Sequence, residues 1–183
     1  MSEPAPGRLE LLQQFVNTLD VETGEDDWAT PGQLSEWMVG RRLLDEGIEL
    51  TPLDLARTVA LREAVRELGR VNDGADPEPE TLAALDREAR SAPIGLRIDS
   101  KGQSTLGPLG EGLDGALGTL LAILATAAAD GSWERMKACR NDECAWLFYD
   151  QSKNRSRHWC AANPCGNLVN ARAYRARQRA SSD

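Results

Sequence analysis

Four cysteines, the only ones in the chain, fall into two pairs with the same spacing in its last third. Four residues separate the members of each pair, and fifteen residues separate the pairs. Two short-spaced pairs, joined by a segment long enough to turn back, are typical of a tetrahedral Zn²⁺ site, because each pair holds one side of the ion. We therefore predict one structural zinc ion per chain, with the ligands Cys139, Cys144, Cys160 and Cys165.

Other uses of these cysteines remain open. A redox-active dithiol is disfavoured, because such sites separate their cysteines by two residues and not by four; the thiols could also form an unpaired structural set. The single histidine, His158, could replace a thiolate, but we expect it at the surface or against a phosphate. A catalytic zinc keeps one coordination position open. Nothing in the sequence indicates a three-ligand site, a nucleophile–base motif or a phosphate-cradling glycine loop, so we expect no enzyme.

The charge of the chain is divided unevenly. Residues 1–132 carry 11 basic and 24 acidic side chains, whereas residues 133–183 carry 10 basic and 5 acidic ones. Residues 151–180 hold seven basic side chains and no acidic one. Such asymmetry indicates two parts with different partners. We predict contacts to a polyanion, with DNA preferred, although a solvated basic tail remains the alternative. The residues expected at DNA are Lys153, Arg155, Arg157, Arg172, Arg175 and Arg179.

Two short elements must position these groups. Residues 145–150 are aromatic-rich and have strand character. A helix is expected to begin after Cys165-Gly166-Asn167 and to continue to about Ala180, with Arg172, Arg175 and Arg179 in one stripe. A module this small cannot bury enough surface alone, so zinc should supply roughly 10–16 kcal/mol of its folding free energy.

The preceding residues predict a mostly α-helical domain. Apolar periodicity indicates helices over 9–19, 31–44, 51–70, 80–90 and 113–129, the third beginning at the capping sequence Thr51-Pro52-Leu53-Asp54. The alternation of Ile94, Leu96 and Ile98 predicts a small hairpin. We therefore expect a helical domain at 1–132 with a small β-hairpin. A four-cysteine zinc-finger module should follow at 133–183, with a short hairpin and a C-terminal helix.

Some polar and aromatic residues in the helical part have two interpretations. Asn17, Thr18 and Arg62 are embedded in helical patterns, where they could form caps and helix–helix hydrogen bonds or line a small-molecule pocket. Trp28, Trp37 and Trp133 are expected in the core or at an interface. In the finger, exposed aromatic rings at Trp146, Phe148, Tyr149 and Trp159 would favour stacking with RNA bases, whereas buried rings would indicate packing.

These motifs resemble a known family. The CGNR zinc-finger family is matched by Cys139-x4-Cys144, Trp146-Leu147-Phe148-Tyr149-Asp150, Ser152-x-Asn154-Arg155-Ser156-Arg157-x-Trp159-Cys160, Cys165-Gly166-Asn167 and Ala171-Arg172-Ala173-Tyr174-Arg175. The preceding part resembles the helical ABATE domain through Phe15-Val16-Asn17-Thr18-Leu19 and Ala60-Leu61-Arg62-Glu63-Ala64. The resemblance implies a bacterial stress-response transcription regulator, with a DNA-binding finger joined to a domain that senses a ligand.

One position departs from the family pattern. The motif ends in arginine, whereas this chain has Leu168, at the N-terminal end of the predicted arginine stripe. The usual arginine would lengthen the phosphate-facing row by one turn. We expect weaker DNA binding with the fold retained, rather than a leucine buried against the finger or a partner.

The sequence therefore predicts a zinc-dependent DNA-binding regulator whose N-terminal domain senses a small ligand. The alternatives are a protein-interaction adaptor that docks an acidic partner, and an RNA-binding module. We expect a cytoplasmic protein without a membrane segment, since no secretory signal is evident and the apolar run 117–129 is short and interrupted. A homodimer is compatible with these features.

Overall fold

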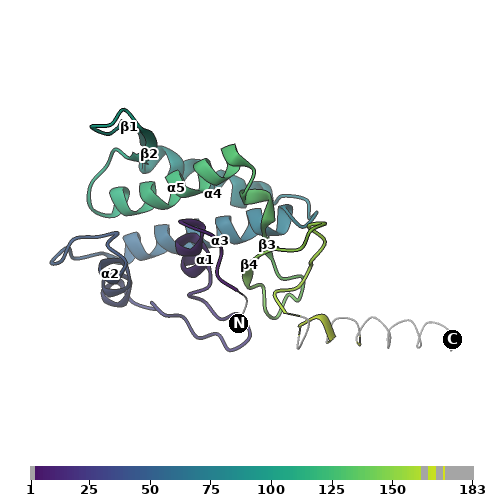
Figure 1. The fold of residues 1–183 in the computed structure, drawn as a ribbon. Helices are drawn as coiled ribbons and strands as arrows, with labels where there is room; N and C mark the ends of the chain where they lie inside the picture. Colours follow the sequence, from purple (N-terminus) through teal and green to yellow (C-terminus); the bar gives the residue numbers. More distant parts are fainter. Residues whose placement is uncertain (1–2, 162–164, 168–170, 172–183) are drawn as a thin grey trace, which may run out of the picture.

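The computed structural model describes residues 3–161, 165–167 and 171 (Figure 1). Five helices lie in the helical part: α1 (Leu9–Val16), α2 (Pro31–Gly40), α3 (Pro52–Val71), α4 (Pro79–Ser91) and α5 (Gly112–Asp130). A hairpin of β1 (Ile94–Ile98) and β2 (Ser104–Pro108) lies between α4 and α5 in the sequence. The short helix η1 (Trp133–Arg135) then leads into β3 (Met136–Ala138) and β4 (Leu147–Tyr149). The predicted mostly α fold, with a small hairpin and a following finger, is confirmed.

Capping residues fix where α2 and α3 begin. At the start of α3 the Asp54 N–H donates to Thr51 Oγ1 over 3.2 Å, while the Thr51 N–H donates to Asp54 Oδ2 over 2.8 Å. Thr30 and Gln33 form the same reciprocal box at α2. A proline follows each cap, where its fixed φ suits the first helical turn. The capping sequence thus predicts the start of α3 correctly.

Helices α1, α3 and α5 enclose the core. Phe15 from α1 stacks on Trp28, with ring centroids 6.0 Å apart, and Trp37 packs against both rings. Trp133 is also buried in this core. The three tryptophans are therefore core residues, as the sequence predicts. Met136 and Leu147 from the finger belong to the same buried cluster, so the helical part and the finger hairpin share one core.

Helix α5 is the most apolar element. By length and composition its 19 residues could cross a membrane, but half of its apolar window is buried inside the fold. It packs against α1 and the hairpin β1–β2, as in Figure 1. The helix ends at Gly131, whose φ of 77° is a left-handed conformation that glycine adopts at little cost.

Two helices are shorter than their apolar periodicity predicts. Helix α1 ends at Val16 rather than near Leu19. The Thr18 carbonyl instead accepts from the Asp27 N–H over 2.9 Å, so the chain has already turned toward the loop that returns to α2. Helix α2 ends at Gly40, and Arg42 then adopts a φ of 57°. In both places tertiary and turn contacts override the pattern.

Candidate metal centre

The hairpin β3–β4 carries the first cysteine pair in its turn. The strands are antiparallel, with Ala138 opposite Leu147, and the Cys139 N–H continues the ladder by donating to the Trp146 carbonyl over 2.9 Å. The Cys144 and Ala145 N–H groups both donate to the Asn141 carbonyl, which closes the loop. The predicted strand in 145–150 is confirmed. Its partner strand precedes Cys139, whereas sequence reasoning did not identify that partner.

The four sulfur atoms meet in one small volume. All lie within 4.8 Å of one another, and the Cys144–Cys160 and Cys160–Cys165 Sγ separations are both 3.7 Å. A tetrahedron with Zn–S bonds of about 2.3 Å has edges of about 3.8 Å. A disulfide would need about 2.05 Å, and all four cysteines are free. The arrangement fits a zinc site and does not fit a disulfide pair.

The thiols influence one another's ionisation. Hydrogen bonds from the Cys144 and Cys160 thiols lower the pKa of Cys139. Proximity to Cys139 raises the pKa of Cys144, and it raises the pKa of Cys160 to about 12. One thiolate is thus stabilised while further negative charge beside it is unfavourable. A divalent cation at the centre would remove that repulsion, because thiolates are the metal-binding form.

Polar side chains of the helical part bind the finger backbone. Asn17 Nδ2 donates to the Leu147 carbonyl over 2.8 Å, and the Leu147 N–H donates to Asn17 Oδ1 over 2.8 Å. Arg66 donates to the Ala145 carbonyl and to the Val16 carbonyl, each over 2.8 Å. Ala145 holds a φ of 47°, which is uncommon for a residue with a side chain. Arg66 therefore fixes the cysteine loop at its strained position.

A close approach at Gly69 brings α3 against the hairpin. A Cβ at this position would lie 2.6 Å from Leu147 Cδ1 and 3.0 Å from the Ala138 N. The Asn72 Nδ2, one turn further, donates to the Trp133 carbonyl over 2.7 Å and to the Met136 carbonyl over 2.8 Å. The C-terminal end of α3 is therefore the platform on which the hairpin rests.

Buried charges complete the junction. Asp73 accepts from the Arg140 guanidinium, its Oδ1 lies 2.7 Å from His158 Nδ1, and it lies 3.6 Å from Lys137 Nζ. Lys137 Nζ also lies 3.1 Å from Asp150 Oδ2. Burial would raise the pKa of Asp150, but hydrogen bonds from Ser152, the Arg157 N–H and Lys137 outweigh it and lower that pKa to about 2. Asp73, which follows α3, is thereby linked to Lys137 and Arg140 at the start of the finger and to His158 further along it.

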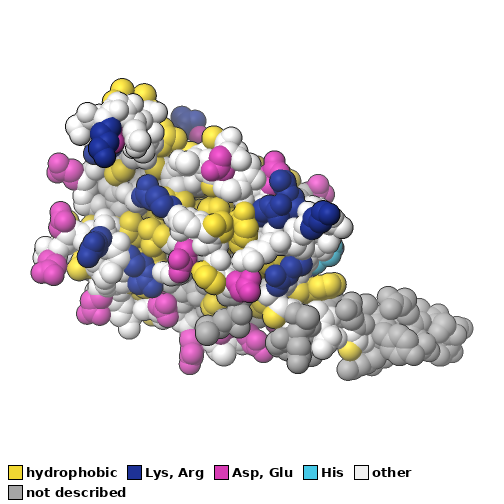
Figure 2. Space-filling model, viewed as in Figure 1, with side chains coloured by type: hydrophobic (Ala, Val, Ile, Leu, Met, Phe, Trp, Pro, Cys, Tyr) yellow, Lys and Arg dark blue, Asp and Glu magenta, His cyan; other side chains and the backbone are white. Residues whose placement is uncertain are grey.

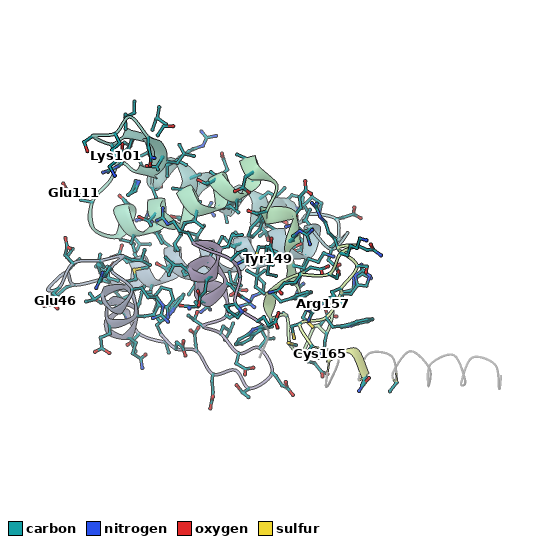
Figure 3. All side chains as sticks on the ribbon, viewed as in Figure 1. Glu46, Lys101, Glu111, Tyr149, Arg157 and Cys165 are labelled. Carbon is teal, nitrogen blue, oxygen red and sulfur yellow. The ribbon has the colours of Figure 1, made fainter. Side chains whose placement is uncertain are left out.

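The predicted DNA contacts have different surroundings. Lys153 is exposed, and Arg155, also exposed, forms an ion pair with Glu134. Arg157 donates to the Cys160 carbonyl over 2.9 Å and lies 5.4 Å from the Phe148 ring centroid. Figure 3 shows Arg157 and Cys165 at the finger end of the molecule. A DNA role for these three residues stays a prediction. Three further predicted contacts, together with Leu168, lie outside the described residues: Arg172, Arg175 and Arg179.

Cys165, Gly166, Asn167 and Ala171 are helical, so helical structure is already present at Cys165, earlier than the predicted start after Asn167. The remainder of that predicted helix, to Ala180, lies outside the described residues.

The three predicted ligand-binding residues all have partners within the protein. Thr18 Oγ1 donates to the Phe15 carbonyl, and Arg62 donates to Thr18 Oγ1 and to both carboxylate oxygens of Asp26. Asn17 binds Leu147, as described above. These contacts correspond to the structural interpretation of the three residues, and a ligand role stays a prediction. Asn17 also lines a cavity that Trp146 of the finger borders.

The aromatic side chains of the finger are buried or half-buried against other side chains. Phe148 is fully buried among the cysteines, while Trp146 and Trp159 are half-buried against the same cluster. Tyr149 is half-buried against the main core. This arrangement favours packing over base stacking.

Several residues that hold the junction together were missed by sequence reasoning, among them Arg66, Asp73, Lys137 and Asp150. Arg66 had one visible signal, since it follows Arg62 by one helical turn with Glu63 between them. Glu63 indeed binds both arginines, each over 2.9 Å. Single charged residues such as Asp73 carry no such signal.

Comparison with known proteins agrees with this architecture. Residues 135–178 match the model described as "CGNR zinc finger". Residues 9–131 match the ABATE model, described as "Putative stress-induced transcription regulator". No curated protein matches the chain. Since the second match spans most of the sequence, the chain belongs to the ABATE family, and it carries a region similar to CGNR zinc fingers.

Proposed function

We propose that the protein is a zinc-dependent, DNA-binding transcription regulator whose N-terminal domain senses a small ligand. The observation that carries the proposal is the tetrahedral spacing of the sulfur atoms beside the segment 151–180, which has no acidic side chain. The ligands are Cys139, Cys144, Cys160 and Cys165. Zinc would hold both ends of the finger and set the direction in which the basic segment leaves it.

Electrostatics supports one DNA-facing end. The part before residue 133 has a net charge of −13 and the part after it has +5, and a zinc ion with four thiolates adds about −2. In Figure 2, acidic side chains predominate around the α2 end, while several basic ones lie toward the β3 end. A phosphate backbone would be repelled by the first surface and attracted by the second. Lys153 and Arg155 are exposed at the finger and suit such contacts.

The contacts between the parts offer a route for regulation. Asn17 and Arg66 bind the backbone of the cysteine loop and of β4 directly. A ligand that shifts α1 or α3 would therefore also shift the loop that holds Cys144. This coupling would change DNA affinity without a separate signalling element.

Salt dependence tests the DNA interface. Each neutralised phosphate contributes about 0.9 to the magnitude of the slope of log K against log[salt]. DNA bound from a random pool by the zinc-loaded protein serves as the probe. The R172A/R175A double variant should flatten the slope by about 1.8 units, whereas R87A/R90A, on the exposed side of α4, should leave it unchanged. An equal slope for the parent protein and R172A/R175A removes these arginines from the interface.

The reverse substitution, which adds an arginine at Leu168, tests the same interface. L168R should steepen the slope by about 0.9, because it would add one phosphate contact to the predicted arginine stripe. An unchanged slope and affinity would contradict this explanation of the departure from the family pattern. Failure of the zinc-loaded protein to bind any DNA, together with binding to an acidic protein partner, would replace the proposal by the adaptor function.

A further inference from the structure

A cavity lined by both charged and apolar side chains lies where the helical part meets the finger. Its volume is about 350 Å³, and it is bordered by α1, the loop before α2, the C-terminal end of α2 and Trp146 of the finger. We propose that this cavity binds a small zwitterion of the α-amino acid class, with its carboxylate on Arg41 and its ammonium group facing Asp27 and Glu10. The proposal rests on the proposed function, because it locates the sensing site and names the chemical class of its ligand.

Arg41 is a cation without a matching anion. Its guanidinium carbon lies 3.9 Å from the Trp37 ring centroid, and its one hydrogen bond, to the Trp37 carbonyl, is long at 3.4 Å. Its Nε is buried without a hydrogen-bond partner. Within the described part of the chain, Arg41 has no carboxylate at ion-pairing distance. Burial lowers the pKa of Arg41, and the charge of Asp27 offsets part of that effect.

The chemistry of this arginine favours a carboxylate ligand. A guanidinium presents its N–H groups in a planar fork that matches the two oxygens of a carboxylate. A ligand carboxylate on Arg41 would supply the charge partner, and could supply the hydrogen bond, that the protein does not. The Trp37 ring already holds the guanidinium in place through a cation–π contact, so less rotamer entropy would be lost on binding.

The other charges of the cavity distinguish between ligand classes. Glu10 and Asp27 both line it, so its own charge with Arg41 is about −1. A simple anion would meet repulsion from two carboxylates, and a simple cation would meet Arg41. A zwitterion would place its carboxylate against Arg41 and its ammonium group against the two carboxylates. The cavity is also at the small end of the range for ligand sites, which begins near 300 Å³.

The same cavity touches the finger. Asn17 lines it and also binds the Leu147 backbone, and Trp146 forms its wall two residues after the predicted zinc ligand Cys144. A bound amino acid would therefore contact α1, α2 and the finger together. Occupancy would bias the position of the cysteine loop relative to α1, which is the coupling that the proposed function requires.

The test is a titration of the zinc-loaded full chain with each of the twenty common amino acids, by calorimetry. At least one should bind. Its amide, which lacks the carboxylate charge, and the corresponding acid without the amino group should each bind at least tenfold more weakly. Binding of the amide as tightly as of the amino acid, or binding of none of the twenty, overturns the proposal without any variant being needed.

Variants then locate the site. R41Q should abolish the binding, whereas R42Q should not, because Arg42 is the exposed neighbour and does not line the cavity. The Trp146 indole N–H resonance, assigned with W146F, should shift on ligand addition. Parent-like affinity in R41Q would overturn the assignment.

The DNA salt slope of R41Q separates this failure from failure of the proposed function. If the protein binds no amino acid but R41Q has a parent-like slope, the proposed DNA binding is retained and only the amino-acid site is rejected. Loss of DNA binding by the parent protein would remove the proposed function, even if an amino acid binds.

Discussion

Asn17 and Leu147 form a two-way hydrogen-bonded pair across 130 residues of sequence, the side chain of the first binding both backbone groups of the second at 2.8 Å. The asparagine amide acts as a strand neighbour for β4, on the side away from β3. A residue at the end of α1 thus satisfies the edge of the finger hairpin. The helical part and the finger therefore depend on one another for stability.

Asn17→Ala should destabilise the zinc-loaded protein by about 1–3 kcal/mol, because it leaves the Leu147 N–H and one bond of its carbonyl unpaired. Urea unfolding measures the change in free energy. Gln14→Ala is the matched control, since Gln14 is exposed on the same helix and binds only Glu10. Equal stability of the two variants would contradict a role for Asn17 in docking the finger.

Gly69→Ala should cost about 1–3 kcal/mol, because the added methyl group must displace the hairpin from α3. The nearest backbone atom, the Ala138 N, cannot move without shifting β3. Gly32→Ala should be neutral or slightly stabilising, since nothing lies within 4 Å of a Cβ there and alanine favours the helix. Thermal unfolding of both variants checks the pair. A parent-like melting temperature for Gly69→Ala would disprove the close approach.

Asp150→Asn should destabilise the protein by about 2–3 kcal/mol at neutral pH, since it removes the buried partner of Lys137. The folded pKa of Asp150, about 2, is below its unfolded value of about 3.9. Its contribution is therefore fully present above pH 4 and is lost as pH falls from about 4 to about 2. The difference from the parent should be equal at pH 6 and pH 8 in urea unfolding. A difference that changes between these two values would assign the effect to another group.

Zinc removal should unfold the finger. Cys160→Ser should weaken zinc binding by at least about 100-fold, because a thiolate ligand is lost, whereas His158→Gln should retain one zinc ion per chain. Zinc content after dialysis against a chelator measures both. Binding by the parent should also release protons near neutral pH, since the pKa values of Cys144 and Cys160 are raised in the absence of a cation. Full zinc content in Cys160→Ser would remove that residue from the ligand set.

Local signals made much of the fold predictable. The start of α3 follows from Thr51 and Pro52, and the end of α5 follows from Gly131. The hairpin β1–β2 follows from the alternation beginning at Ile94. Each of these signals depends on the side chains of a few residues that are neighbours in the sequence. The ends of α1 and α2 were predicted too far along the chain, because Asn17 binds the backbone of Leu147 and Arg42 adopts a left-handed φ of 57°.

The sequence by itself determined that four cysteines, spaced for a tetrahedral ion, stand beside a basic segment, since spacing and charge are properties of the chain alone. Only the tertiary structure decided how that centre joins the helical part. Gly69 and Arg66 acquire their roles from backbone atoms more than 60 residues away, the Ala138 N and the Ala145 carbonyl. Asp73 acquires its role from equally distant side chains, such as that of Arg140. Burial also decides which charges matter, because Lys137 and Asp150 interact strongly only where water is excluded.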